Sequence, residues 1–147
     1  MQTLEILVEE ADVVSLHVPL TDQTYHLIDD PMIERMRPDA ILINTARGGL
    51  IDHAALLDAL ERGKLFGAGL DATDPEPLPP DHPLLTNPHA VVTPHVAAAT
   101  FAAKARLYES AVGQALQVLR GQRPDHLVNP TVWPLRRPDP SSQEKRA

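Results

Sequence analysis

The amino-acid sequence predicts an α/β fold built on a doubly wound parallel sheet. Four short apolar runs without polar alternation recur within the first 93 residues, as expected for strands covered on both faces of a parallel sheet. Segments with helical spacing and recognisable caps alternate with these runs, so right-handed βαβ crossovers are expected. In such a sheet the ligand crevice lies at the carboxyl ends of the strands.

Proline and glycine mark the boundaries of the predicted strands. Pro19 stops the first run, Pro38 and the Gly48-Gly49 turn bound the second, and Pro94 ends the fourth. The strands are expected at residues 12–16, 40–44, 65–70 and 90–93.

Candidate N-caps precede three stretches with helical spacing. Side-chain oxygens at these positions can accept from the free N–H groups of a first helical turn. Pro31 follows the first cap directly, at a helical position where a missing N–H costs nothing. The caps are Asp30, Asp52 and Thr100, and their helices are expected to end before Pro38, at Gly63 and at Gly121.

Composition excludes several classes of protein. The 147 residues carry 13 Lys and Arg against 20 Asp and Glu, a net charge of −7, and 43% of the residues are hydrophobic, which fits one globular domain. Aromatic residues are only 3%, which together with the acidic charge argues against nucleic-acid binding. Without cysteine, disulfides, thiolate metal sites and cysteine nucleophiles are excluded.

The first residues are acidic rather than basic, with Glu5, Glu9 and Glu10 among them, so they do not resemble a secretory leader. No apolar run approaches the roughly 18–20 residues of a membrane span. We therefore expect a cytoplasmic protein with no membrane partner.

Charge and proline divide the chain unevenly. Residues 1–119 hold 7 basic and 17 acidic side chains, whereas residues 120–147 hold 6 basic and 3 acidic ones and are rich in proline. We expect a folded domain over residues 1–121, including a C-terminal helix, and an extended, poorly ordered tail over residues 122–147.

Three charged or polar side chains follow the predicted strands and are candidates for chemistry. Arg47 comes after the second strand, and its planar cation suits a substrate carboxylate. His95 comes after the fourth strand and can serve as a general acid near neutral pH. Glu76, in the proline-rich loop DPEPLPP, could orient that imidazole. Each also has a plainer explanation: a surface arginine, a structural histidine and a solvated loop acid.

Two apparent motifs are rejected. The segment GAGLDA matches G-x-G-x-x-A, yet it lies within a predicted strand, whereas the dinucleotide fingerprint follows a strand and opens a helix. Prolines separate His82, His89 and His95, and no second ligand follows at helical spacing, so no metal site is expected.

Four segments, in one order and spacing, resemble the D-isomer-specific 2-hydroxyacid dehydrogenases, the family of glyoxylate/hydroxypyruvate reductase and D-3-phosphoglycerate dehydrogenase. The resemblance covers about residues 8–121, and DPEPLPPDHPLL looks most like the glyoxylate/hydroxypyruvate reductase branch. The segments are ADVVSLHVPLTDQTYHLID, INTARGGLID, GAGLDATDPEPLPPDHPLL and VVTPHVAAAT.

The resemblance implies an oxidoreductase that transfers hydride between NAD or NADP and a small 2-keto or 2-hydroxy acid. Arg47 would bind the carboxylate and keto oxygen, His95 would protonate that oxygen, and Glu76 would pair with His95. Asp71 would hold the nicotinamide carboxamide. The remaining cofactor contacts would come from Val18, Pro19, Thr45, Ala46 and Ala98, with Arg47 and His95 also beside the cofactor.

The main departure from the family pattern is the lack of a G-x-G-x-x-G turn that opens a helix. The chain resembles the second half of a Rossmann-type dinucleotide-binding domain plus a C-terminal helix, so we expect weak cofactor binding and no activity of this chain alone. An unpaired sheet edge would favour a homodimer or other association. The alternative is a non-catalytic, partner-dependent or corepressor-like relative.

Overall fold

The computed structural model describes residues 2–136, which fall into two compact units that divide between Ala97 and Ala98. Each unit is described by itself. The predicted boundary between a domain ending at residue 121 and a tail beginning at residue 122 stays a prediction, and residues 137–147 of that tail lie outside the described part.

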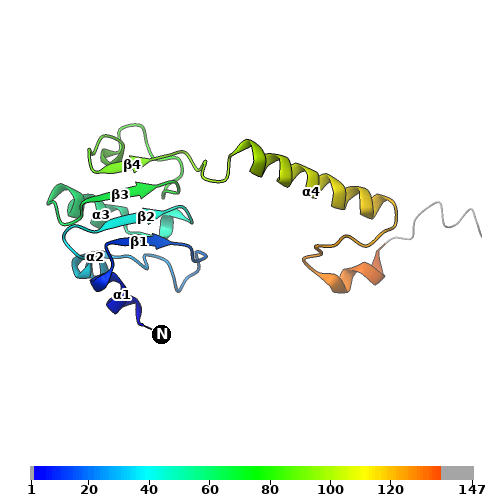
Figure 1. The fold of residues 1–147 in the computed structure, drawn as a ribbon, viewed down its shortest axis with the longest axis horizontal. Coiled ribbons are helices and arrows are strands. Elements are labelled where there is room, and N and C mark those ends of the chain that lie inside the picture. Colours follow the sequence, from blue (N-terminus) through cyan, green and yellow to red (C-terminus); the bar gives the residue numbers. More distant parts are fainter. Residues whose placement is uncertain (1, 137–147) are drawn as a thin grey trace, which may run out of the picture. The chain divides into compact units, whose positions relative to one another are not determined.

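The first unit contains the predicted parallel sheet (Figure 1). The four strands lie in sequence order, β1-β2-β3-β4, and each neighbouring pair is parallel. This confirms the α/β fold class and the existence of all four strands, each slightly shorter than predicted. The strands are β1 (Val13–Leu16), β2 (Ile41–Asn44), β3 (Gly67–Leu70) and β4 (Ala90–Val92).

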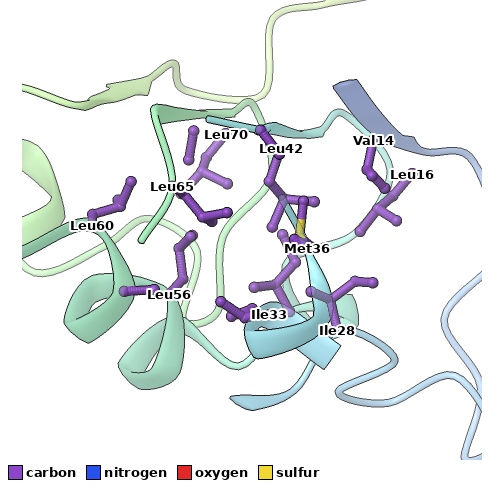
Figure 2. Packing of buried hydrophobic residues seen from close by; sticks show 14 of the residues in the cluster. Val14, Leu16, Ile28, Ile33, Met36, Leu42, Leu56, Leu60, Leu65 and Leu70 are labelled. Atoms are coloured by element: carbon purple, nitrogen blue, oxygen red, sulfur yellow. The ribbon is translucent and has the colours of Figure 1, made fainter. Parts of the chain in front are cut away.

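Helices α2 and α3 cover one face of this sheet (Figure 2). Leu42 of β2 and Leu70 of β3 belong to the same core cluster as Leu56 and Leu60 of α3, and all four are fully or almost fully buried. Burying side chains of this size contributes about 1.5–3 kcal/mol each. The helices of the unit are α1 (Leu4–Glu10), α2 (Asp30–Arg35) and α3 (His53–Glu61), with short 3-10 helices at Gly48–Leu50 and Pro83–Leu85.

Within the first unit taken by itself, helices cover only one face of the sheet, and the expectation that the strands are covered on both faces stays a prediction. Burial alternates along β1 and β2, and Val13 and Val91 are 52% and 68% exposed. The strands follow one another in a single direction across the sheet, so the two crossovers that contain an α-helix, through α2 and α3, fall on the same face when both have the usual right hand. Among the strands that the structure describes, β1 pairs with β2 alone, and association through this edge stays a prediction.

Two of the three predicted helix caps are confirmed. Asp52 accepts from the N–H groups of Ala54 and Ala55, and Thr100 accepts from Ala103. The first cap is Asp29 instead of Asp30, because the Asp29 carboxylate accepts from the N–H of the residue three positions on, which places Asp30 inside the helix.

The second unit consists mainly of the long helix α4 (Phe101–Leu119), followed by a 3-10 helix at Pro130–Leu135. No side chain of α4 is buried. No helix within residues 2–136 is both long enough and apolar enough to cross a membrane.

Candidate active site

The loop that follows β3 carries Glu76 to the carboxyl edge of the sheet. The Thr73 hydroxyl donates to the carbonyl oxygen of Pro75 at 3.0 Å, and the side chain of His53, at the start of α3, contacts the backbone of Asp74. The loop is therefore fixed by contacts on the residues just before Glu76.

The loop that follows β4 brings His95 to the same edge. His95 adopts a φ of 53°, a left-handed conformation that is uncommon for a residue other than glycine, and its N–H donates to the carbonyl of Thr93. Its Nδ1 lies 2.6 Å from Oε1 of Glu76, and both side chains are partly exposed. The structure thus joins two candidates that are 19 residues apart in the sequence.

Asp71 holds the His95 loop against the end of β3. One carboxylate oxygen accepts from the Thr93 hydroxyl and the Val96 N–H, and the other accepts from the Ala97 N–H at 2.8 Å. The Thr93 hydroxyl, followed by the Ala97 and Val96 amides, holds the pKa of the Asp71 carboxyl below its ordinary value of 3.8, against the opposing effect of burial. Sequence reasoning missed this role, and the predicted contact of Asp71 with nicotinamide stays a prediction.

This arrangement predicts a pH-dependent anchor. Because the folded-state pKa of Asp71 lies below 3.8, its stabilisation of the loop is complete above that pH and is lost as pH falls through the lower folded value. In Asp71→Asn, whose amide nitrogen cannot accept, we expect hydrogen-exchange protection at Ala97 to fall about tenfold or more and to lose its acid dependence.

The measurement is the protection factor of the Val96 and Ala97 amides by NMR, from neutral pH to below pH 3.8. Asp81→Asn, a change at an exposed acid in the neighbouring loop, is the matched control and should leave both amides unchanged. Unchanged protection in Asp71→Asn would contradict the anchoring role.

Arg47 stands at the end of β2, in a turn that a buried asparagine fixes. The Asn44 side chain, with no exposed surface, donates to the Arg47 carbonyl at 2.8 Å and accepts from the Ala46 N–H at 3.0 Å. The exposed Arg47 guanidinium donates to the Ala46 carbonyl and forms no ion pair within residues 2–136. Its charge is therefore available to an anion. Asn44 is the polar residue that ends the otherwise apolar run ILIN, and this position was the sequence signal that could have indicated its role.

The Arg47 turn and the Glu76 loop meet backbone to backbone at Gly48. A Cβ atom added at Gly48 would overlap the carbonyl group of Thr73. The lack of a side chain at this position therefore lets the turn after β2, which carries the cation, pack directly on the loop that carries the carboxylate.

Two hollows open beside these residues. One, of about 260 Å³, lies against the Glu76–His95 pair and is walled by Leu78, Leu85 and Val92. The other, of about 650 Å³, lies at the ends of β1 and β2. Its lining is His17, Val18, Pro19, Leu20, Ala46 and Arg47.

The lining of the second hollow fits part of a dinucleotide. It contains one arginine and no acidic side chain, which suits a polyanion, and the partly exposed Val18 and Leu20 offer apolar surface to a flat ring. It also brings together Val18, Pro19, Ala46 and Arg47, four of the predicted cofactor residues. Thr45 is exposed beside them, whereas Ala98 belongs to the second unit, so the contact predicted for Ala98 stays a prediction.

A parallel α/β sheet with a His–Glu pair at its carboxyl edge, beside an arginine that has no ion pair among residues 2–136, is typical of dinucleotide-dependent oxidoreductases. The segment GAGLDA begins with β3, Gly67–Leu70, so it is not the glycine turn of this class. Comparison with known proteins identifies the family. The family model "D-isomer specific 2-hydroxyacid dehydrogenase, NAD binding domain" matches residues 1–97. The chain belongs to this family, as the resemblance indicated.

Named relatives agree with this assignment. The chain is 47% identical over 133 residues to a glyoxylate reductase of Thermofilum pendens, covering 90% of this chain and 39% of that protein. It is 43% identical over 129 residues to glyoxylate/hydroxypyruvate reductase B of an Enterobacter species, covering 88% and 40%. The chain therefore spans about 40% of the length of the relatives it matches.

Solved structures share the fold. The TT0316 protein from Thermus thermophilus superposes with a TM-score of 0.84 at 53% identity, over 87% of this chain and 41% of that one. D-lactate dehydrogenase with NAD+ from Lactobacillus jensenii superposes with a TM-score of 0.81 at 33% identity, over 87% and 42%.

Proposed function

We propose that this chain supplies the proton donor, its carboxylate partner and the substrate-binding cation of an NAD- or NADP-dependent 2-hydroxyacid dehydrogenase. The substrates would be small 2-keto acids of the glyoxylate and hydroxypyruvate kind, as in the named relatives. The observation that carries the proposal is the 2.6 Å contact between His95 Nδ1 and Glu76 Oε1 at the carboxyl edge of the sheet.

In this proposal Glu76 orients the imidazole of His95. With Nδ1–H donating to Glu76, Nε2 is the nitrogen that gives a proton to the keto oxygen of the substrate. Glu76 also stabilises the imidazolium before the transfer, as a third group does in a catalytic triad. The pair is partly exposed, so a substrate can reach it.

Arg47 would bind the substrate carboxylate and the developing negative charge on the keto oxygen. A permanently charged, forked donor is suited to both tasks, because the charge on the oxygen increases as the transition state forms. The nicotinamide cofactor, when bound, supplies the hydride. Val18, Pro19, Thr45, Ala46 and Ala98, together with Asp71, are the residues we propose for holding it.

The test uses a chimera in which this chain replaces the matching segment of the Thermofilum pendens glyoxylate reductase. We expect the chimera to reduce glyoxylate or hydroxypyruvate with NADH or NADPH, and the 147-residue chain alone to bind NADH weakly without turnover. A folded chimera that binds NADH but does not reduce either keto acid would refute the proposal. Turnover by the chain alone would refute the expectation that activity needs the rest of the chimera.

Arg47→Ala in the chimera should lower kcat/KM by about 10²–10³-fold, since it removes a donor to the developing oxyanion. Arg47→Lys keeps the charge without the fork and should recover only part of the loss. Steady-state kinetics with both keto acids measures the effect. Arg37→Ala, at an exposed arginine paired with Asp12 and Asp39, is the matched control and should leave the rates unchanged.

A further inference from the structure

The only buried histidine among residues 2–136 lies beside the Glu76 loop. His53 is the first residue of α3 and is 8% exposed. Its side chain contacts the backbone of Asp74, which lies 21 residues later in the loop after β3. Its Nδ1 lies 3.0 Å from the Asp74 carbonyl oxygen and 3.3 Å from the Asp74 nitrogen. No other side chain or backbone group in the described part of the chain contacts either Asp74 backbone group by a hydrogen bond, and the tautomer of His53 decides which of the two contacts is one.

The surroundings of the ring indicate which nitrogen carries the proton. Nε2 of His53 is buried and has no hydrogen-bond partner among the described residues. A buried N–H without an acceptor costs more than a bare acceptor nitrogen. The neutral ring is therefore protonated at Nδ1 and donates to the Asp74 carbonyl at the shorter of the two distances.

The contact lies close to Glu76 along the chain. Asp74 is two residues before Glu76, and the only hydrogen bond of the Glu76 carboxylate within residues 2–136 is with His95. The direction of the Glu76 side chain is thus determined by the backbone that precedes it. That backbone is held by Gly48 packing on Thr73, by the Thr73 hydroxyl, and by His53.

We propose that His53 is a positioning residue for the catalytic pair: by holding the Asp74 carbonyl, it sets the Glu76 carboxylate against Nδ1 of His95. That this positioning serves catalysis rests on the proposed function. The effect of His53 on the contact between Glu76 and His95 does not. An apolar side chain of similar size would fill the space but leave the Asp74 carbonyl without its donor.

The experiment compares His53→Leu with His53→Asn in the 147-residue chain. Asparagine places its amide nitrogen near the position of Nδ1 and can donate to Asp74, whereas leucine cannot. The readout is the neutral tautomer of His95, read from long-range ¹H–¹⁵N correlation spectra at a pH where the ring is neutral. This measurement needs neither cofactor nor turnover.

In the parent chain we expect His95 to be mainly the Nδ1–H tautomer, since Glu76 accepts at that nitrogen. Glu76→Ala, the positive control, should shift the population to the Nε2–H form that an unconstrained histidine side chain prefers. His53→Leu should give the same shift, and His53→Asn should retain the parent population.

Retention of the parent tautomer in a folded His53→Leu, or its loss in His53→Asn, would overturn the proposal. If the leucine variant fails to fold, His53→Gln replaces it, because its amide reaches past the Nδ1 position and should also give the shift. A parent chain without the Nδ1–H tautomer would instead contradict the Glu76–His95 pair, and with it the proposed function.

Discussion

His95→Gln in the chimera is expected to lower kcat for keto-acid reduction by about 10²–10⁴-fold, the usual contribution of a positioned general acid. Glutamine retains a polar side chain of similar length but cannot release a proton to the keto oxygen. Stopped-flow or steady-state measurement of NADH oxidation gives the rate, and fluorescence titration gives the affinity for NADH, which should change little.

Two comparisons separate loss of the proton donor from general damage. His89→Gln alters an exposed histidine that contacts the Phe66 carbonyl away from the pair and should keep most of the activity. Glu76→Gln should lower kcat less than His95→Gln, because the imidazole remains while its charged partner is lost. A decrease of less than about tenfold in His95→Gln would show that another group donates the proton.

Local sequence signals predicted most of the fold. The β-branched run of β1 and the caps at Asp52 and Thr100 are properties of a few adjacent residues, and each was recognised correctly. The first cap was assigned to Asp30 instead of Asp29, because either of two adjacent aspartates can serve as a cap. The sequence also does not show which elements of the first unit cover each face of the sheet, since the apolar character of a strand is the same whichever element packs on it.

The candidate site was predictable only for residues whose side chain itself suggests a role, such as a cation, a carboxylate or an imidazole at the end of a strand. Arg47, Glu76 and His95 follow strands, and strand ends converge in a parallel sheet. The roles of Asp71, Asn44 and His53 depend on which backbone groups lie opposite them in space. Asp71 and Ala97 are 26 residues apart, so no local pattern indicates that one binds the other.

Gly48→Ala is expected to destabilise the first unit by about 3 kcal/mol, because the new methyl group must displace backbone and cannot simply push aside a flexible side chain. Urea unfolding followed by circular dichroism measures the change. Gly69→Ala is the matched control, since its Cβ would meet only the Ile43 side chain at 3.9 Å, an ordinary contact distance. Equal stability of the two variants would contradict the close approach of Gly48 to Thr73.

The same substitution should also separate the two halves of the proposed site. Any relief of the overlap moves the Arg47 turn away from the loop that carries Glu76, so the cation and the Glu76–His95 pair no longer act on one substrate. We therefore expect folded Gly48→Ala chimera to lose turnover even below its unfolding temperature. Gly49→Ala, whose Cβ would meet the flexible Leu20 side chain at 3.1 Å, should lose less activity because a side-chain rotation relieves the contact. A Gly48→Ala chimera with parent activity would mean that the geometry between the turn and the loop does not limit catalysis.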